Sequence, residues 1–277
     1  MKKLVVGIPC HNESDFICQC LSSIRPNNLD DVNVEIYDNA STDDTVHKVK
    51  KFIESLPAQE RSSFTLKTRA QKVPPTESFM STFQESESEY FLWVGAHDLL
   101  SENYLDKCLG VIESNADVSM VSGKALGFSG DFENIKDLGI VYDFSDPHPM
   151  VRYLKSLKEL NNCTVLHSIF RRQNLKELTI SLNCPSADHI IISNLLWHGK
   201  LQYVNDVGYL RRYFDNTDRH KKLNDGHYVS KDNNTSFYQE YLGSFRNLSS
   251  KKFPEIIQKH LEKTVFDTLV SRFGIPC

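Results

Sequence analysis

Four short polar clusters contain the residue types that hold nucleotides, cations or protons in enzymes. Carboxylates accept hydrogen bonds from ring N–H groups and sugar hydroxyls, whereas amides both donate and accept. An aspartate beside a histidine can hold a divalent cation, and a carboxylate can remove a proton from a hydroxyl. This chemistry requires a fold that brings together four clusters that lie far apart in the chain: Cys10 to Ser14, Asp38 to Asp44, His97-Asp98 and Asp188-His189.

The segments in front of three clusters are short apolar runs, which predict buried strands. They are Leu4 to Pro9, Val32 to Tyr37 and Tyr90 to Val94, and runs of this kind are typical of parallel strands that are buried on both faces. Apolar residues at helical spacing follow each polar cluster. Alternating strands and helices predict an α/β protein with a doubly wound, mostly parallel sheet. Ligands bind at the carboxyl ends of the strands in such a sheet.

Later segments predict further elements. We expect strands at Phe64 to Thr68, Val118 to Gly123 and Gly139 to Phe144, a strand-like segment at Asn162 to Phe170, and a strand pair at Tyr203 to Tyr213. Residues 236–273 have a helical pattern and predict a small C-terminal helical appendage.

The composition is that of an ordinary globular protein. With 277 residues, 40% of them hydrophobic, the chain fits one large α/β domain or one domain with an appendage. A net charge of -4 gives no basic footprint for nucleic acid, and no apolar run is long enough to span a bilayer. We expect a cytoplasmic protein, with peripheral contact at the inner face of the membrane left open. Seven scattered cysteines without a Cys-x-x-Cys pair favour reduced thiols.

The loops after the first two strands are acidic and rich in amides rather than in glycine. No Gly-x-Gly-x-x-Gly or Walker pattern is present, so the loops suit hydrogen bonds to a base and a ribose better than a phosphate cradle. Helix capping is the alternative role for such residues. Ser41, followed by Asp44, resembles a capping box, and we expect it to cap the next helix. For Asp38, capping and ligand binding both remain open.

Three stretches together resemble a family 2 glycosyltransferase of the GT-A fold. Val5 to Glu13 resembles the opening strand with its Pro-x-x-Asn-Glu end. Ile36 to Thr45 resembles the Asp-Asp/Asn-x-Ser-x-Asp-x-Thr segment, and Phe91 to Leu100 stands at the place of the metal-binding Asp-x-Asp strand end. The resemblance covers the first 125 residues well and extends loosely to residue 220. It implies a Rossmann-like GT-A domain over residues 1–230, with a nucleotide-sugar half at 1–125 and an acceptor half at 126–230, followed by a helical segment at 231–277.

The resemblance also implies roles for individual residues on the donor side. A nucleotide would be bound by Pro9, Asn12, Glu13, Asp38, Asn39 and Arg69. The Asp-x-Asp pattern itself is altered, because Gly95, Ala96 and His97 precede Asp98. Asp98 with His97 would hold Mn²⁺ or Mg²⁺, since Mg²⁺ uses only one or two protein carboxylates besides water and phosphate. Weak metal binding, or none, is the alternative.

On the acceptor side, Ser186 to His189 resembles the Glu-Asp pair that opens a helix in this family, with Ala187 in place of the glutamate. Asp188 would then be the catalytic base; an ordinary helix cap is the alternative. A loop that closes over the diphosphate in the family makes Arg211, Arg212 and His220 candidates for contact with it. Arg171 and Arg172 are expected to flank a helix, and His167 is left without a role.

The resemblance therefore implies an inverting glycosyltransferase. It would move a sugar from a nucleotide-diphosphate donor, a UDP-sugar, to a hydroxyl of a glycan or lipid-linked glycan acceptor in surface polysaccharide synthesis. A non-catalytic nucleotide- or carbohydrate-binding relative with a degenerate metal motif is the alternative. A nucleotidyltransferase would need a glycine- and lysine-rich loop where Cys10 to Ser14 stands. Convergence of Asp98 and Asp188 on one cleft would favour the enzyme.

Overall fold

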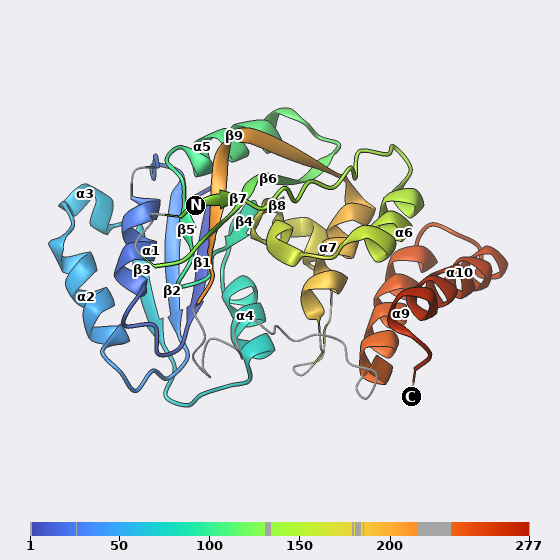
Figure 1. Cartoon of the computed structure of the whole chain (residues 1–277), viewed down its shortest axis with the longest axis horizontal. Coiled ribbons are helices and arrows are strands. Elements are labelled where there is room, and N and C mark those ends of the chain that lie inside the picture. The colour runs from blue at the N-terminus through green and yellow to red at the C-terminus, as the bar shows by residue number, and fades with distance from the viewer. Residues whose placement is uncertain are drawn as a thin grey trace.

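The fold is an α/β sheet flanked by helices, with further helices at its C-terminal side (Figure 1). The computed structural model describes residues 2–25, 27–130, 134–178, 180, 184, 186–214 and 234–276. Within those ranges no helix is long and apolar enough to cross a membrane.

The first half of the chain alternates strands with helices, as expected. The predicted strand at Phe64 to Thr68 is confirmed with the same bounds. The elements are β1 (Leu4–Cys10), α1 (Ile17–Ile24), β2 (Val32–Asp38), α2 (Thr45–Ser55), α3 (Ala58–Arg61), β3 (Phe64–Thr68), α4 (Pro75–Gln84), β4 (Tyr90–Trp93), β5 (Leu99–Leu100) and α5 (Tyr104–Ser114).

The second half adds antiparallel strands and more helices. Its elements are β6 (Val118–Phe128), β7 (Lys136–Asp137), α6 (Pro149–Glu159), a 3₁₀ helix (Cys163–His167), β8 (Ile169–Arg171), a second 3₁₀ helix (Arg172–Leu175), α7 (Ala187–His198), β9 (Lys200–Arg212), α9 (Asn234–Ser250) and α10 (Glu255–Phe273).

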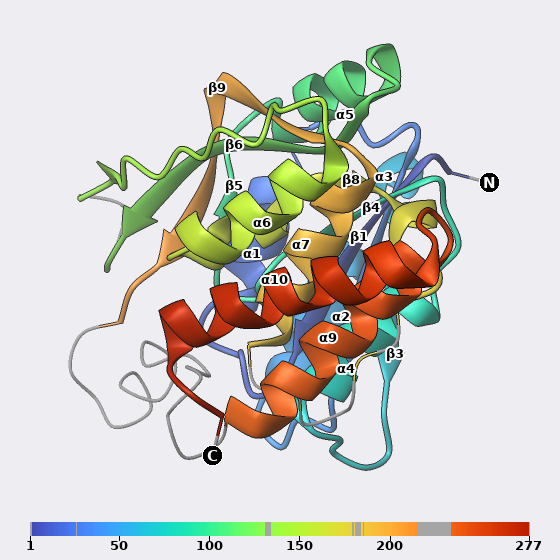
Figure 2. The ribbon, with the colours of Figure 1, turned by 90° about the vertical axis from the view of Figure 1, so that its right-hand side faces the viewer.

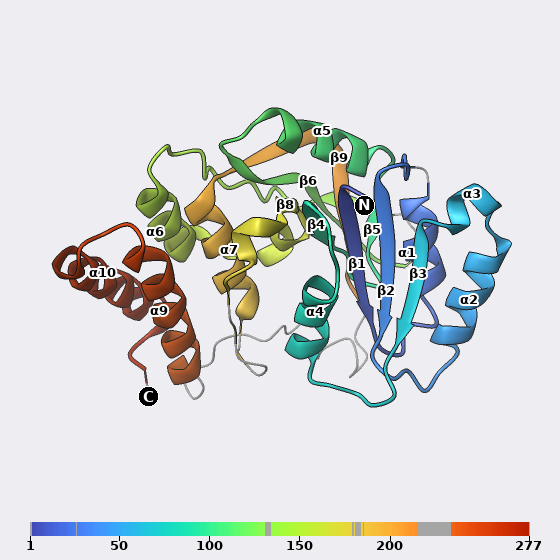
Figure 3. The same ribbon diagram turned by 180° about the vertical axis from the view of Figure 1, so that it is seen from behind.

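The described strands form one sheet in the order β3-β2-β1-β4-β8-β6-β9-β5, with β7 beside β6. β1 pairs in parallel with both β2 and β4, and β2 pairs in parallel with β3, so these four strands lie side by side (Figure 3). β8 runs antiparallel to its neighbours β4 and β6. Because the parallel strands all end on one edge, the loops after β1, β2 and β4 come together there.

Alternate residues of the central strands serve two separate cores. Val5, Phe91 and Trp93 face the core that also holds α6, α7, α9 and α10. Leu4, Val6 and Leu92 face the core beneath α1, α2 and α5. This period of two is that of a pleated strand with both faces covered, which explains why the strands are apolar runs.

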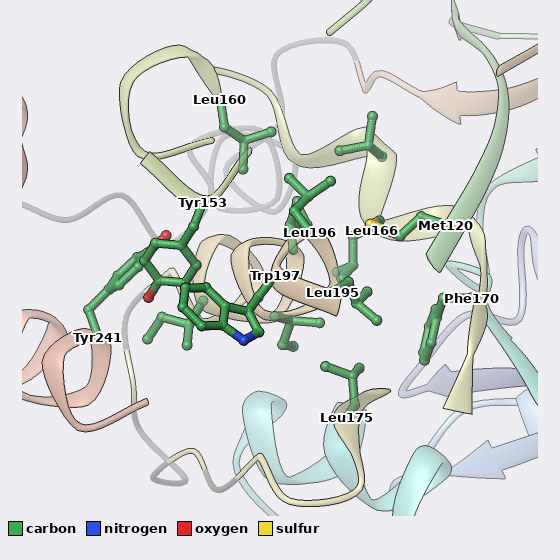
Figure 4. Packing of buried hydrophobic residues seen from close by; sticks show 14 of the residues in the cluster. Met120, Tyr153, Leu160, Leu166, Phe170, Leu175, Leu195, Leu196, Trp197 and Tyr241 are labelled. Atoms are coloured by element: carbon green, nitrogen blue, oxygen red, sulfur yellow. The ribbon is translucent and has the colours of Figure 1, made fainter. Parts of the chain in front are cut away.

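The C-terminal helices complete the first of these cores. Figure 4 shows Tyr241 of α9 beside Tyr153 and Trp197, with Leu195 and Leu166 between Trp197 and the sheet residues Met120 and Phe170. Figure 2 shows α9 and α10 lying across α6 and α7. Arg272 of α10 donates to the carbonyls of Ser156, Leu157 and Leu160 at the end of α6. The division at residue 230 stays a prediction.

Several local predictions were wrong. Gly139–Phe144 is not a strand, and Asn162–Phe170 is mostly the 3₁₀ helix that leads into β8. The strand pair at Tyr203–Tyr213 is one long strand, β9. Ser41 does not cap α2, which has no side-chain cap; its hydroxyl accepts from the backbone N–H of Asn12 instead. Apolar patterns alone do not separate strands from extended loops that pack on a core.

Candidate functional site

The loops after β1 and β2 are held together by side-chain to backbone hydrogen bonds. The backbone N–H of Glu13 donates to Thr45 Oγ1 at 2.8 Å, and that of Thr42 donates to Asn12 Oδ1 at 2.8 Å. Asn12 and Ala40 adopt left-handed φ values of 56° and 55°, a conformation that asparagine tolerates better than most residues. The two loops therefore form one unit, in which the Asn12 side chain is used for structure.

Two carboxylate oxygens in this unit lack a partner. Asp38 is 2% exposed and Glu13 8%. Asp38 Oδ2 accepts from the backbone N–H of Ser41 at 3.1 Å, but Asp38 Oδ1 and Glu13 Oε2 are buried without a hydrogen bond from any described residue. A buried, unsatisfied carboxylate oxygen is costly. These two atoms are therefore the natural acceptors for N–H or O–H donors of a ligand.

The other donor-side candidates are placed differently. Asn39 both donates to the carbonyl and accepts from the N–H of Val73, each at 2.9 Å, so its amide closes a loop. Arg69 donates from its backbone to Asp38 but pairs its guanidinium with Glu85 at 2.7 Å. Pro9 is half-buried in β1 and lies opposite Tyr37 of β2. These three residues lie around the unit formed by the two loops. The polar groups of the Asn39 and Arg69 side chains already have partners within the protein.

Asp98 follows β4, and both of its carboxylate oxygens accept hydrogen bonds from other residues of the chain. Asp98 Oδ2 accepts from the Tyr209 hydroxyl at 2.7 Å, and Oδ1 accepts from the Arg212 backbone N–H at 2.8 Å. The Tyr209 hydroxyl in turn accepts from the N–H of Gly95. A Cβ at Gly95 would lie 2.5 Å from Asp98 Oδ2, so a larger residue there would displace the carboxylate. Asp98 thus joins the end of β4 to β9.

His97 lies between Asp98 and the donor loops. Its Nδ1 is 3.3 Å from Glu13 Oε1, and its ring contacts Phe214 edge-on. Burial alone would lower the pKa of His97, but the carboxylates of Asp98 and Glu13 together raise it above its usual value.

The described residues around Asp98 do not form a ready-made cage of several cation ligands. Both of its oxygens are engaged, and its side chain is buried. Within the described ranges no group of three or more His, Cys, Asp or Glu side chains is placed to hold an ion. Asp98 and His97 as metal ligands stay a prediction from the resemblance.

The three diphosphate candidates differ in their surroundings. Arg212 is buried, and its guanidinium donates to the His97 carbonyl and to Gln19 Oε1, so it acts as a structural clamp. Arg211 is half-buried and lies over the Tyr213 ring. His220 lies outside the described residues.

His167, which the sequence left without a role, is in contact with both β4 and β9. Its ring stacks on Tyr209 with centroids 4.3 Å apart, and its Nδ1 is 2.9 Å from the Trp93 carbonyl. Burial lowers the pKa of His167; the charge of Asp98 opposes this, and that of Arg211 adds to it. His167 is thus within electrostatic range of both the β4 end and Arg211. A histidine at the end of a short apolar segment was the only sequence signal for it. The arginines after it are structural, since Arg171 and Arg172 donate to backbone carbonyls.

Asp188 lies in the first turn of α7, as expected, where the helix N-terminus favours a carboxylate. Its Oδ1 accepts from the backbone N–H of His189 at 2.9 Å. The Cys163 thiol is within hydrogen-bonding reach: burial raises the pKa of Cys163, the Asp188 carboxylate raises it further, and Arg211 lowers it. Arg211 therefore acts electrostatically on His167 near Asp98 and on Cys163 near Asp188. Asp98 is not among the described residues that line the cavity beside Asp188, so convergence of the two carboxylates on one cleft stays a prediction.

Solved structures share this fold. S. aureus TarS 1–349 in complex with UDP-GlcNAc matches with a TM-score of 0.69 and 16% identity over 98% of this chain and 73% of that one. The complex of TarS 1–349 with UDP matches with a TM-score of 0.66 and 15% identity, covering 98% and 72%. The mannosyltransferase PcManGT from Pyrobaculum calidifontis, with GDP-Man and Mn²⁺, matches with a TM-score of 0.57 and 14% identity, covering 97% and 73%. At these identities the likeness concerns the GT-A fold.

The sequence itself carries the family signal. No curated protein matches the chain. The model of the family described as "Glycosyl transferase family 2" matches residues 5–179, more than half of the chain. The predicted GT-A fold is confirmed, and the chain belongs to glycosyl transferase family 2 and is a glycosyltransferase.

Proposed function

We propose that this chain is an inverting transferase that moves a sugar from a UDP-sugar to a hydroxyl of a neutral glycan acceptor. The observation that carries the proposal is the pair of buried, unpartnered oxygens, Asp38 Oδ1 and Glu13 Oε2. Uracil offers a ring N–H and ribose offers hydroxyls, which are the donors that such acceptors require. The matches to TarS bound to UDP and UDP-GlcNAc support the choice of UDP.

The nucleotide would lie over the joined loops after β1 and β2. Asp38 would accept from the base or the ribose, and Glu13 from a ribose hydroxyl. Asn12 and Asn39 would keep the loops in place through their bonds to Thr42 and Val73. Pro9 and Arg69 would shape the edge of this surface. Because the acceptor atoms are fixed before the ligand arrives, little ordering is needed on binding.

Asp188 would act as the general base. Its carboxylate, held by the His189 N–H at the start of α7, would take the proton of the acceptor hydroxyl as that oxygen attacks the anomeric carbon. The bond from the anomeric carbon to the diphosphate oxygen breaks in the same step, so the configuration inverts and no sugar becomes attached to the protein. Asp188 ends the step protonated and returns its proton to water.

The leaving diphosphate gathers negative charge, and we assign Arg211 to offset that charge. Its guanidinium acts electrostatically on His167 and Cys163, which lie between the β4 end and Asp188. A fixed cation at this point stabilises charge as it develops. A divalent cation remains a prediction from the resemblance. Asp98 and His97 would hold it, although each Asp98 oxygen already accepts one hydrogen bond within the protein.

A panel experiment tests the proposal. UDP, GDP and dTDP are titrated calorimetrically into the protein, and the corresponding sugar nucleotides are then followed for release of the nucleotide diphosphate. We expect UDP to bind most tightly, and NMR of the product to show the opposite anomer to the donor. Retention of the donor configuration, or no binding by any of the three nucleotides, would overturn it. If all three nucleotides bound with equal affinity, UDP would no longer be assigned as the nucleotide of the donor.

The role in surface polysaccharide synthesis, with a lipid-linked glycan as the alternative acceptor, belongs to the same proposal and is supported by the resemblance alone. The non-catalytic alternative is disfavoured by the position of Asp188. It lines a cavity and lies beside Cys163, on which the Arg211 charge also acts, whereas a binding module needs no such carboxylate.

A further inference from the structure

A cavity of about 250 Å³ lies between α4 and the first turn of α7, and Asp188 forms part of its wall. Figures 1 and 3 show α4 and the start of α7 side by side. α4 begins at Pro75, just after Val73, which is held to the loop after β2 by both hydrogen bonds of the Asn39 amide. One wall of the cavity is therefore tied to the donor loops, and the other carries the proposed base.

Apolar side chains dominate this wall, among them Phe79, Met80, Leu166 and Ile191. The Phe79 ring is held firmly, because it stacks on Trp93 with centroids 4.5 Å apart while Trp93 Nε1 donates to the Phe79 carbonyl. A hydroxyl pressed against such a surface loses its bonds to water and gains none. A methyl group in the same place loses nothing and buries apolar area.

The described side chains of the cavity wall also carry negative charge but no positive charge. Asp188 is the only ionisable acid among the described residues that line the cavity, and no lysine or arginine is among them. A carboxylate or phosphate on the occupant would therefore face Asp188 with no lysine or arginine among the described lining residues to compensate it. Like charges at short range in a partly buried site are unfavourable.

We propose that this cavity binds the acceptor, and that the acceptor is an uncharged sugar unit with a methyl-bearing group beside the hydroxyl that is glycosylated. An N-acetyl group and a deoxy position both supply that methyl. The inference rests on the proposed function, since it takes Asp188 as the base. Its volume, below that of most small-molecule pockets, suits one sugar ring rather than several.

An acceptor panel tests this proposal. It contains the methyl glycosides of an N-acetylhexosamine, a 6-deoxyhexose, a plain hexose and a hexuronic acid, each with the donor that the enzyme uses. One methyl-bearing acceptor should exceed the plain hexoside in kcat/KM by about 10- to 200-fold, the range for one methyl-sized group in an apolar pocket. The first two acceptors separate the two sources of the methyl. The hexuronide should be the poorest, and a hexuronide or plain hexoside that equals the best acceptor overturns the proposal.

The variant Thr76→Lys places a cation in the cavity wall, because Thr76 is half-buried and lines it. It should raise the kcat/KM of the hexuronide relative to the plain hexoside by at least about tenfold, since it supplies the missing counter-charge. The matched control, Thr65→Lys, adds the same charge on the exposed face of β3 and should leave the ratio unchanged. A change in the KM of the donor, with no change in acceptor preference, would show that the donor sugar occupies the cavity and overturn the proposal.

A water-acceptor assay separates this inference from the proposed function. Slow hydrolysis of the sugar nucleotide needs no sugar acceptor, and it should be lost in Asp188→Asn. If wild type neither binds the nucleotide nor hydrolyses the donor, the proposed function fails. If hydrolysis is present but the panel shows no preference, only the acceptor assignment fails. Saturation-transfer NMR of each methyl glycoside with the donor-free protein gives a readout of binding that does not depend on turnover.

Discussion

The carboxylates that follow β1, β2 and β4 differ in whether all of their oxygens accept hydrogen bonds from the protein. After β1 and β2, Glu13 and Asp38 each keep one buried oxygen that has no partner in the part of the chain that the structure describes. After β4, Asp98 has both oxygens engaged, by Tyr209 and by the backbone of Arg212. The three residues belong to the same edge of one sheet and are all buried. The unpaired oxygens belong to the proposed nucleotide site, whereas those of Asp98 join two strands.

This difference shows that position at a strand end is a weaker guide to function than the state of each oxygen. A buried acceptor without a donor costs stability unless a ligand supplies the donor. An oxygen that already accepts a hydrogen bond within the protein, like each oxygen of Asp98, needs no ligand to offset its burial. The family resemblance drew attention to all three carboxylates, and the hydrogen bonds separate them.

We expect the largest effect from a change at a fourth carboxylate, that of Asp188, which can be compared with the three carboxylates above. Its Oδ1 accepts one backbone bond and its side chain borders a cavity, so it should behave as a functional residue. Asp188→Asn should lower kcat about 10²- to 10⁴-fold, the contribution of a general base, with the affinity for UDP unchanged. Stopped assays of UDP release measure this. Asp143→Asn, at an exposed surface aspartate, is the control and should retain wild-type turnover.

Glu13→Gln should weaken UDP binding while the protein remains folded. The amide replaces a charged acceptor by a neutral one, and hydrogen bonds to charged groups contribute about 1.5–3 kcal/mol, or roughly ten- to a hundredfold in Kd. Isothermal titration with UDP gives the value. Glu35→Gln is the matched control. Glu35 lies in β2 and is buried like Glu13, but its carboxylate accepts hydrogen bonds from Tyr37 and Lys67. Unchanged UDP affinity in Glu13→Gln would remove Glu13 from the donor site.

Asp98→Asn should show the reverse behaviour, with a loss of stability and no loss of nucleotide affinity. One carboxylate oxygen becomes an amide N–H that faces a hydrogen-bond donor, Tyr209 or the Arg212 backbone. We expect about 1–3 kcal/mol less free energy of unfolding, measured by urea denaturation. Tyr209→Phe, which removes one of the two donors, should cost less than Asp98→Asn. Wild-type stability in Asp98→Asn would contradict the structural role.

We expect the smallest effect from a change at Asp43, whose carboxylate accepts hydrogen bonds from the backbone N–H groups of Ser14 and Thr45. Burial would raise the pKa of Asp43, but hydrogen bonds from Thr45 and Ser14 lower it to about 2, from 3.8. A group with a lowered folded pKa stabilises the protein above the unfolded pKa, and this contribution is lost as the pH falls from 3.8 towards 2. Denaturation of wild type and Asp43→Asn between pH 5 and pH 2 (about the range of this titration) should show a shallower acid slope in the variant. Parallel slopes would mean that the bonds to Thr45 and Ser14 contribute little.

The sequence predicted the sheet edge well, because the signals for it are local. The apolar runs that became β1, β2 and β4 are followed at once by their polar loops. Asp188 at the start of a helix was predicted on the same kind of local pattern.

The state of Asp98 was beyond prediction, since its partners Tyr209 and Arg212 lie 111 and 114 residues further along the chain. The same holds for Asn39, which the sequence placed on the nucleotide and the structure bonds to Val73, 34 residues away. Ser41 bonds to Asn12 across two loops rather than capping its own helix. The resemblance singled out Asp98 and Asn39 and a local capping pattern singled out Ser41, but none of these signals contains the distant hydrogen-bond partner.

The most direct test of the central claim is one titration of UDP into wild type, Asp38→Asn and Asp98→Asn side by side, in EDTA and in Mn²⁺, at a temperature where all three are folded. We expect Asp38→Asn to weaken UDP binding roughly ten- to a hundredfold, because the unpaired Asp38 Oδ1 is the proposed acceptor for the nucleotide, and Asp98→Asn to bind UDP as wild type does. If instead Asp98→Asn abolishes binding, UDP requires Mn²⁺ and Asp38→Asn binds normally, the roles assigned to the two carboxylates are reversed and the account is wrong.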